Sequence, residues 1–192
     1  MILVVGCPRS GTGFISALFK EHGFDVGHEA WGRDGIADWR LTGDDSFWRG
    51  FSLCPAEIRC AHPAVHQVRH PLGTISSMLT IAEVSWGIME KSIPPRPKAV
   101  HPLHRAMHVY IHWNRLAQQR ASYTYRVENI RQEYPELCRR AGFVSTLKPD
   151  FATSEKTNGR QHESLSWADL ESVNAPLAMQ VRALAVEYGY TM

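Results

Sequence analysis

Residues 4–13 read Val4-Val5-Gly6-Cys7-Pro8-Arg9-Ser10-Gly11-Thr12-Gly13, and this stretch decides how the 192-residue chain is interpreted. The apolar run before it, residues 1–5, is typical of a strand buried on both faces of a parallel sheet. After it, apolar residues recur at helical spacing between Phe14 and Phe19, so a helix is expected to begin near Gly13. A strand, a glycine turn and a helix N-terminus aim several backbone N–H groups at one point. The stretch therefore predicts a site for an anion such as a phosphate.

This loop differs from the phosphate-binding loop of nucleoside triphosphatases in the residues that follow its second glycine. Gly6 and Gly11 stand at the spacing G-x-x-x-x-G, but Thr12 and Gly13 replace the Lys and the Ser or Thr of those enzymes. That lysine supplies charge at the β- and γ-phosphates, and the hydroxyl binds Mg²⁺. Here a cation is supplied inside the loop, by Arg9. We therefore expect an anion site that works without a metal ion.

A second candidate anion site follows another strand-like run, residues 65–68. Arg69 comes at the carboxyl end of this predicted strand, where ligands bind in open parallel sheets. Pro71 suits the first turn of a helix, and that helix would carry Ser77 in its second turn. A planar, always charged guanidinium beside a hydroxyl is a good receptor for a terminal phosphate. The alternative is an arginine that pairs with a surface carboxylate.

Three segments resemble one family, the sulfotransferases that use 3′-phosphoadenosine-5′-phosphosulfate (PAPS). Pro8-Arg9-Ser10-Gly11-Thr12 resembles their 5′-phosphosulfate loop, and Arg69-x-Pro71 with Ser77 is similar to their 3′-phosphate element R-x-P-x-x-x-x-x-S. A weaker match is Tyr125-Arg126-Val127-Glu128-Asn129-Ile130, which resembles a later Y-R-x-E-D-L element with Asn129 in place of Asp. Together the matches span residues 1–130.

The resemblance implies PAPS as the donor, 3′-phosphoadenosine-5′-phosphate (PAP) as the product, and no metal. Arg69 and Ser77 would hold the 3′-phosphate. The family closes a late loop over the donor with a cation, and Arg160 is a loose match for it. The 5′-phosphosulfate would be held by Arg9 and the amides of Ser10, Gly11, Thr12 and Gly13.

The acceptor needs a general base, and Gly27-His28-Glu29 follows the predicted second strand on the side of the glycine loop. Either His28 or Glu29 can remove a proton as the acceptor oxygen attacks, and related sulfotransferases use one or the other. We favour Glu29, although nearby cations lower the pKa of a carboxylate and weaken it as a base. The alternative is that both side chains only hold their loop by hydrogen bonds.

The order of strand-like and helical segments predicts one α/β domain over residues 1–192: three layers, α/β/α, with a central parallel sheet as in P-loop nucleoside triphosphate hydrolases. Residues 30–57, rich in glycine and aromatic residues, are expected to be irregular. A helix with an apolar stripe should run from Pro71 to about Ala82. The other predicted segments are a short strand at 24–27, a proline-rich surface loop at 92–102, a long helix at 103–117, a strand at 123–127, a helix at 129–141 ending at Gly142, a loop at 148–166 and a terminal helix at 177–188.

Composition excludes several classes of protein. With 44% hydrophobic and 21% charged residues the chain forms a core and is not disordered, and a net charge of +2 without basic clusters argues against nucleic-acid binding. No apolar run has transmembrane length and no signal peptide is evident, so we expect no membrane association and a cytoplasmic location. The four cysteines lack C-x-x-C spacing and are expected to be free thiols: Cys7, Cys54, Cys60 and Cys138.

Two rival functions remain open: a divergent small-molecule kinase and a non-catalytic nucleotide-binding module. The acceptor is expected to be a small molecule or a carbohydrate with a hydroxyl or amine, and neither its identity nor the oligomeric state follows from the sequence. His104, His108 and His112 recur at i, i+4, i+8 but have no carboxylate beside them, so we do not expect a metal site there. The tryptophans are expected to pack in the core or a lid, among them Trp31, Trp39, Trp48 and Trp86.

Overall fold

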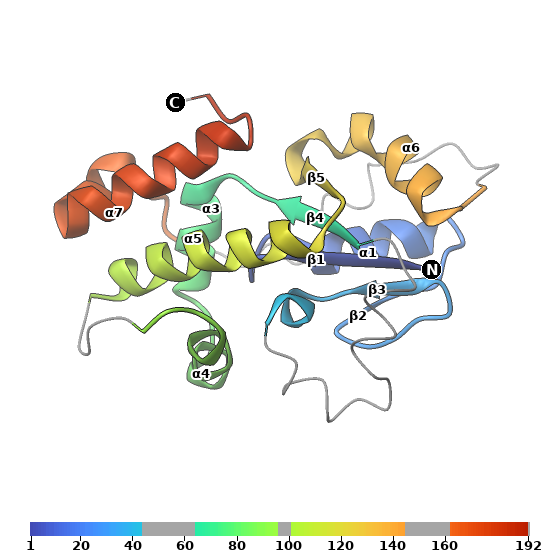
Figure 1. Cartoon of the computed structure of the whole chain (residues 1–192), viewed down its shortest axis with the longest axis horizontal. Coiled ribbons are helices and arrows are strands. Elements are labelled where there is room, and N and C mark those ends of the chain that lie inside the picture. Colours follow the sequence, from blue (N-terminus) through green and yellow to red (C-terminus); the bar gives the residue numbers. More distant parts are fainter. Residues whose placement is uncertain (44–63, 96–100, 145–161, 192) are drawn as a thin grey trace.

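A parallel β-sheet forms the centre of the computed structural model, which describes residues 1–43, 64–95, 101–144 and 162–191 (Figure 1). Neighbouring strands run parallel throughout, in the order β2-β3-β1-β4-β5. The predicted α/β class with a central parallel sheet is therefore confirmed. The five strands are β1 (Ile2–Gly6), β2 (Val26–His28), β3 (Gly35–Ala37), β4 (Ala64–Val68) and β5 (Tyr123–Arg126).

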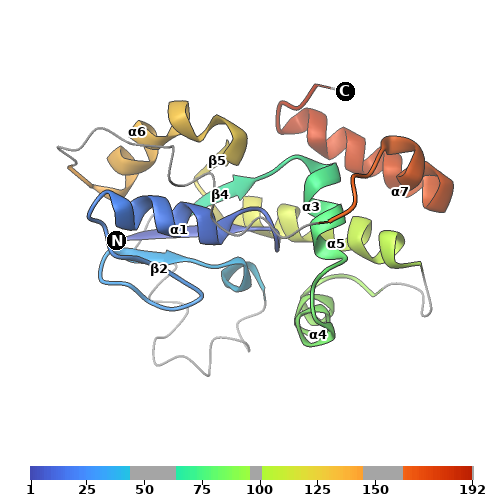
Figure 2. The same ribbon diagram turned by 180° about the vertical axis from the view of Figure 1, so that it is seen from behind.

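Helices cover both faces of the sheet. Ile2 and Val4 point to the face covered by α1 and α6, whereas Leu3 and Val5 point to the face covered by η1 and α5. This period-2 alternation of side chains buries β1 from both sides. Figures 1 and 2 show α5 and α1 on opposite sides of the sheet. The helices are α1 (Thr12–Glu21), η1 (Trp39–Thr42), α3 (Pro71–Met78), α4 (Glu83–Ser92), α5 (Pro102–Arg120), η3 (Val127–Asn129), α6 (Ile130–Ala141) and α7 (Trp167–Glu187).

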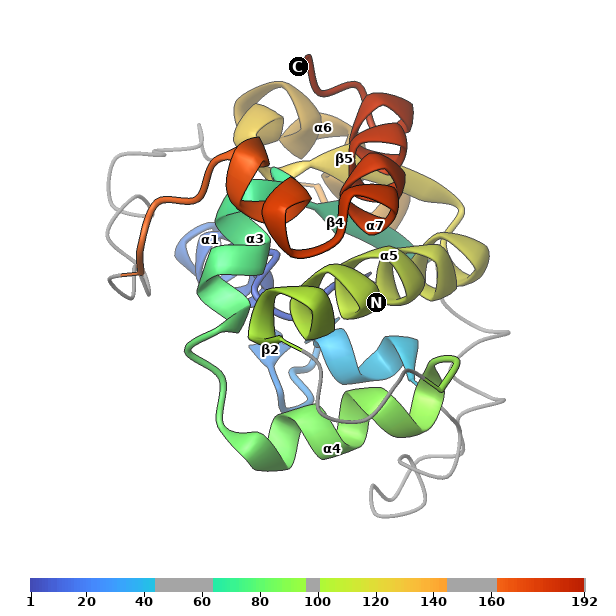
Figure 3. The same ribbon diagram turned by 90° about the vertical axis from the view of Figure 1, so that its left-hand side faces the viewer.

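The remaining helices build a second part of the core on the α5 side. Helices α3, α4 and α7 pack with α5 in a cluster that includes Trp113, Tyr110 and Met107, all buried. Figure 3 shows α7 and α3 on one side of α5 and α4 on the other. The same cluster takes in Cys7 from the loop after β1 and Val68 from the end of β4. This part of the core therefore reaches the carboxyl-end edge of the sheet.

Several helix boundaries follow the sequence signals. Pro102 is the first residue of α5, where its missing N–H costs no hydrogen bond. Helix α6 ends at Gly142, which has φ 70° and accepts this left-handed conformation at low cost. Ser166 caps α7 in a capping box with Asp169. The predicted helices at 103–117, 129–141 and 177–188 are thus confirmed. Helix α7 begins at Trp167, ten residues before the predicted terminal helix, and is interrupted at Asn174, whose backbone is non-helical.

Two predictions about the elements were wrong. Gly35–Ala37 forms strand β3 inside the stretch predicted to be irregular, because a strand of three residues carries no readable alternation. A Cβ on Gly35 would lie 2.1 Å from the carbonyl oxygen of Ile2, so only glycine lets β3 approach β1 this closely. The predicted helix to Ala82 is too long: α3 ends at Met78, and Ala82 is the extended N-cap of the next helix, α4.

None of the helices in the described ranges combines the length and the apolarity needed to cross a membrane. The cytoplasmic location stays a prediction. The two cysteines within those ranges, Cys7 and Cys138, are buried free thiols. Cys54 and Cys60 lie outside them.

A buried histidine in β4 makes the stability of the fold depend on pH. His66 contacts Asn114 Oδ1 through Nε2 at 3.1 Å and Thr124 Oγ1 through Nδ1 at 3.3 Å. Asn114 Nδ2 donates to the Tyr110 carbonyl, which makes Oδ1 the acceptor and places the proton of His66 on Nε2. Desolvation by burial lowers the pKa of His66 from 6.5 to about 4. The side chain is therefore neutral in the folded protein at pH 7.

Acidification from pH 6.5 to pH 4 is expected to destabilise the protein through His66. The unfolded chain binds a proton at this side chain below pH 6.5, while the folded protein does so only near pH 4, so the stability present above pH 6.5 is lost as the pH falls. The shift corresponds to about 3 kcal/mol. Urea unfolding at pH 7 and at pH 4 measures how much the free energy of unfolding decreases on acidification. In His66→Gln this decrease should be smaller than in the wild type by about this amount. An equal drop in both proteins would contradict the assignment.

Candidate functional site

The candidate site lies where the central strands end. All five strands run parallel, so their carboxyl ends meet at one edge of the sheet. β1 ends at Gly6 and β4, its hydrogen-bonded neighbour, ends at Val68. Residues 6–13, which we call the glycine loop, connect β1 to α1, and Arg69 directly follows β4. The two sequence segments predicted to bind anions therefore emerge side by side.

The glycine loop places the open N-terminus of α1 at this edge. Gly11 is the N-cap of α1 with φ 102°, a conformation that favours glycine, and it provides no side-chain cap. The first-turn N–H groups of Thr12, Gly13 and Phe14 thus have no capping side chain. The Ser10 N–H is already bonded to the Cys7 carbonyl at 3.0 Å, which leaves the other predicted amides as the donors to an anion. N–H groups arranged in this way at a helix N-terminus are able to bind an anion.

Arg9, Ser77 and Arg69 converge beside this loop. Arg9 Nε donates to Ser77 Oγ at 2.8 Å, although the two residues are 68 positions apart in the chain. Arg69 Nη1 donates to the carbonyl of Arg9 at 3.2 Å. Ser77 is buried in the last turn of α3. The structure therefore brings together residues that were predicted from the sequence to bind two different groups of one ligand: Arg9 for the 5′-phosphosulfate, and Arg69 with Ser77 for the 3′-phosphate.

The underside of the loop is held by a residue that the sequence analysis missed. Gln67, buried in β4, donates from Nε2 to the Ser10 carbonyl at 2.6 Å. Ser10 Oγ is itself buried without a hydrogen-bond partner, and it fills the space that a Cβ on Gly6 would occupy, 2.6 Å away. An unpaired buried hydroxyl is costly unless a ligand or water completes it. The polar side chain of Gln67 within the strand-like run at residues 65–68 was the available signal.

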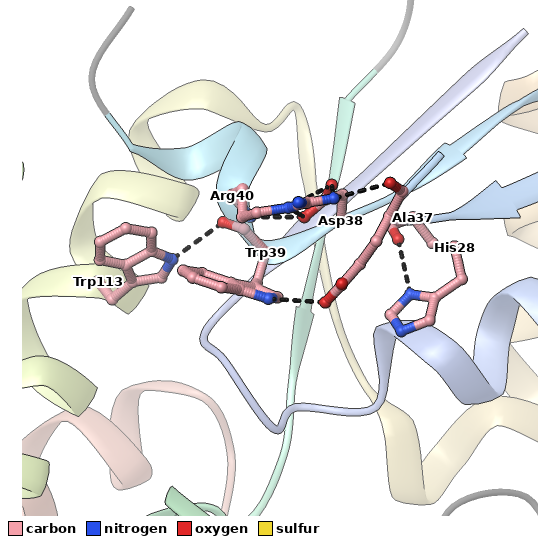
Figure 4. A network of polar contacts seen from close by, with 7 residues as sticks. His28, Ala37, Asp38, Trp39, Arg40 and Trp113 are labelled. Atoms are coloured by element: carbon pink, nitrogen blue, oxygen red, sulfur yellow. Dashed lines mark hydrogen bonds and ion pairs between the residues drawn. The ribbon is translucent and has the colours of Figure 1, made fainter. Parts of the chain in front are cut away.

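Of the candidate bases, His28 is the last residue of β2 and Glu29 directly follows it, and β3 lies between β2 and β1. His28 Nδ1 lies 3.1 Å from the Ala37 carbonyl (Figure 4). A carbonyl only accepts, so Nδ1 carries the proton of the neutral ring and Nε2 keeps a lone pair. Glu29 Oε1 accepts from Trp39 Nε1 at 3.0 Å. Trp39 is buried, so this bond holds the Glu29 carboxylate against the ring nitrogen of Trp39.

A buried ion pair fixes the backbone of Glu29. Arg40 Nη2 lies 2.6 Å from Asp38 Oδ2, and the same nitrogen donates to the Glu29 carbonyl at 2.7 Å. Asp38 is buried at the end of β3, and its N–H donates to the Val4 carbonyl in β1. Burial raises the pKa of Asp38, which Arg40 partly offsets. The residues that hold Glu29 in place, Asp38 and Arg40, lie in the region predicted to be irregular and were not foreseen.

Arg9 and Glu29 share an unusual backbone conformation. They are the two non-glycine residues of the described segments with positive φ, 69° and 53°. This conformation costs a side chain about 1–2 kcal/mol relative to the right-handed region. Such strain is concentrated at functional sites, where the surrounding contacts enforce it. Both residues carry catalytic roles in the assignment made from sequence.

Other predicted features lie elsewhere or outside the described residues. Arg160 and Trp48 are outside them. His162, two positions after Arg160, lies with Nδ1 2.9 Å from Ser76 Oγ, next to Ser77. Burial raises the pKa of the Cys7 thiol in the glycine loop well above its usual value, so Cys7 is a packed thiol and not a thiolate nucleophile.

The structure places the histidines of α5 close together and two of the tryptophans in the core. The rings of His108 and His112 are 4.4 Å apart on α5, and no group of three or more metal-ligating side chains is present in the part of the chain described. Trp39 packs on Trp113 with ring centroids 5.6 Å apart, and Trp86 is buried beneath Arg105. The prediction that these two tryptophans pack in the core is confirmed.

Comparisons of the chain with protein-family models, with curated proteins and with solved structures found no significant match.

Proposed function

We propose that this protein is a sulfotransferase that moves a sulfuryl group from PAPS to a hydroxyl or amine of a small-molecule or carbohydrate acceptor. In this proposal the strand, glycine loop and helix at residues 2–21 form a P-loop-like donor site. Arg9 and the amides of Gly11, Thr12 and Gly13 hold the 5′-phosphosulfate. Arg69 and Ser77 hold the 3′-phosphate, and Arg160 closes over the donor.

The observation that carries this proposal is the convergence of Arg9, Ser77 and Arg69. The 2.8 Å bond from Arg9 to Ser77 and the 3.2 Å bond from Arg69 to the Arg9 carbonyl join the two motifs at one edge of the sheet. A donor with phosphate groups at both the 5′ and the 3′ position needs two neighbouring cationic sites. ATP has a single phosphate chain and requires only the first. The second arginine, Arg69, beside Arg9 and Ser77 therefore favours PAPS as the donor.

The chemical step needs in-line attack on sulfur. The acceptor oxygen forms a bond to sulfur while the bond between sulfur and the 5′-phosphate oxygen breaks, PAP leaves, and the acceptor proton goes to Glu29 or, alternatively, to His28. A sulfuryl group carries less negative charge than a phosphoryl group. The Arg9 guanidinium and the oriented amides of the loop are therefore suited to stabilise the transfer without Mg²⁺.

PAP is expected to raise the melting temperature of the protein more than ATP or ADP does at equal concentration. The reason is that Arg69 and Ser77 provide a site for the 3′-phosphate, and only PAP has one. EDTA should leave the shift unchanged, since Thr12 and Gly13 replace the lysine and the Mg²⁺ ligand. Thermal unfolding with each nucleotide, with and without Mg²⁺ and EDTA, measures this.

Turnover separates the proposal from its two rivals. Incubation with PAPS and a panel of phenols, sugars and amines should yield a product heavier by one sulfuryl group in mass spectrometry. A larger melting shift with Mg·ATP than with PAP would favour the divergent kinase. Binding of PAP without transfer to any acceptor would favour the non-catalytic module.

A further inference from the structure

One row of residues crosses three strands beneath the glycine loop. Gly6 of β1, Gln67 of β4 and Tyr125 of β5 are register partners. Register partners in parallel strands point to the same face, and Val65, two residues before Gln67, places this face on the side of α1. Gln67 and Tyr125 are almost completely buried, at 0% and 2% exposure. The row is therefore a buried polar platform in an otherwise apolar face of the sheet.

The hydrogen bonds of this row fix which way the Gln67 amide points. Burial raises the pKa of Tyr125 well above its usual value, so its hydroxyl keeps its proton and donates to Gln67 Oε1 at 2.5 Å. The other end of the amide, Nε2, consequently faces the loop and donates to the Ser10 carbonyl at 2.6 Å. The Ser10 carbonyl fixes this orientation, because a carbonyl has no proton to give and must face the nitrogen of the amide.

The bond to Ser10 also orients the next amide of the loop. The Ser10 carbonyl points down to Gln67, and none of the described peptide bonds is cis. In a planar trans peptide the N–H points opposite to the C=O, so the Gly11 N–H points away from the sheet. It joins the uncapped N–H groups of Thr12 and Gly13 at the start of α1. A Cβ on Gly11 would lie 2.9 Å from Gln67 Nε2, which shows how closely the amide supports the loop.

We propose that Gln67 and Tyr125 are positioning residues that hold the Gly11 N–H toward an anion bound in the glycine loop. The identity of that anion as a 5′-phosphosulfate rests on the function proposed above. The pair acts through the Ser10–Gly11 peptide and touches neither donor nor acceptor. Its removal should lower anion affinity by more than a loss of stability explains.

Three variants separate positioning from stability: Gln67→Met, Tyr125→Phe and the double variant. Each single change leaves a buried polar partner unpaired and destabilises the protein. The double change removes both partners of the bond between Tyr125 and Gln67 and leaves only the Ser10 carbonyl unpaired, so the double variant should be more stable than Gln67→Met. We expect the Kd for PAP, measured by calorimetry, to rise about 10-fold in Gln67→Met and in the double variant. Tyr125→Phe, in which Gln67 still donates to Ser10, should show about a 3-fold rise.

Tyr134→Phe is the matched control. Tyr134 OH lies 2.5 Å from His22 Nδ1 in the core near the far end of α1, so this variant also removes a hydroxyl from a buried pair. Its Kd for PAP should equal that of the wild type. If the double variant does not fold, the Kd for PAP is compared between Tyr125→Phe and Tyr134→Phe, which both lose a single hydroxyl. A rise in Tyr125→Phe alone would support the positioning role.

The outcomes distinguish this inference from the proposed function. A double variant that is more stable than Gln67→Met and binds PAP like the wild type would show that the pair is only a core hydrogen bond, and the sulfotransferase proposal would stand. If the wild type binds Mg·ATP and not PAP, the sulfotransferase proposal fails. The role of Gln67 and Tyr125 is then tested with ATP, by the ratio of the Kd of each variant to the Kd of the wild type. A wild type that binds neither nucleotide nor inorganic pyrophosphate overturns both.

Discussion

Glu29→Gln is expected to lower kcat by about 10²–10⁴ while leaving the Kd for PAP nearly unchanged. Glutamine keeps the size of the side chain, and its oxygen still accepts from Trp39 Nε1, so the local packing is preserved. What it loses is the ability to take the proton of the acceptor. Steady-state rates and calorimetric titration with PAP measure both quantities.

His28→Asn is the control for this assignment. Asparagine still donates a hydrogen bond but lacks the Nε2 lone pair that makes His28 the second candidate. If His28→Asn abolishes turnover while Glu29→Gln keeps most of it, His28 is the base. If both variants turn over at wild-type rates with intact PAP binding, the base lies elsewhere, and His104, His108 and His112 are the next residues to substitute.

Arg9→Ala and Arg69→Ala are expected to fail in different ways. Arg9 is placed at the transferred group, and loss of a donor to developing charge should lower kcat on the order of 10²–10³. Arg69 is placed at the remote 3′-phosphate, so its removal should cost about 1.5–3 kcal/mol of donor binding, on the order of 10- to 100-fold in Kd. Arg69→Ala also removes the bond to the Arg9 carbonyl, so a small loss of kcat should accompany it.

A control of equal charge change is Arg33→Ala. Arg33 is exposed and pairs with Asp34, whose carbonyl accepts from the N–H of Ile2 at the amino end of β1, opposite to the site. This variant should retain both kcat and donor affinity. Pre-steady-state kinetics, which separates kcat from Kd, tests this division of roles. Equal losses of kcat in Arg9→Ala and Arg69→Ala would contradict it.

The elements with strong local signals were predictable. An apolar run before Gly6, helical periodicity after Gly13 and the proline after Arg69 each depend on residues a few positions apart. Such signals gave the central strands, the start of α1 and the long helix α5. Strand β3 was not predicted, because three residues carry no periodicity. Gly35–Ala37 is a strand because its backbone pairs with β1, beginning at Ile2.

By itself, the sequence determined that a glycine loop carries an arginine in place of a lysine and that a second arginine and a serine follow another strand. Only the tertiary structure decided that Arg9 contacts Ser77, that β3 lies between β2 and β1, and that Gln67 and Tyr125 support the loop. These facts depend on strand order and register, which are set by packing between segments more than 30 residues apart. Local spacing specifies an element, whereas the partner of each side chain follows from which strands the whole core brings together.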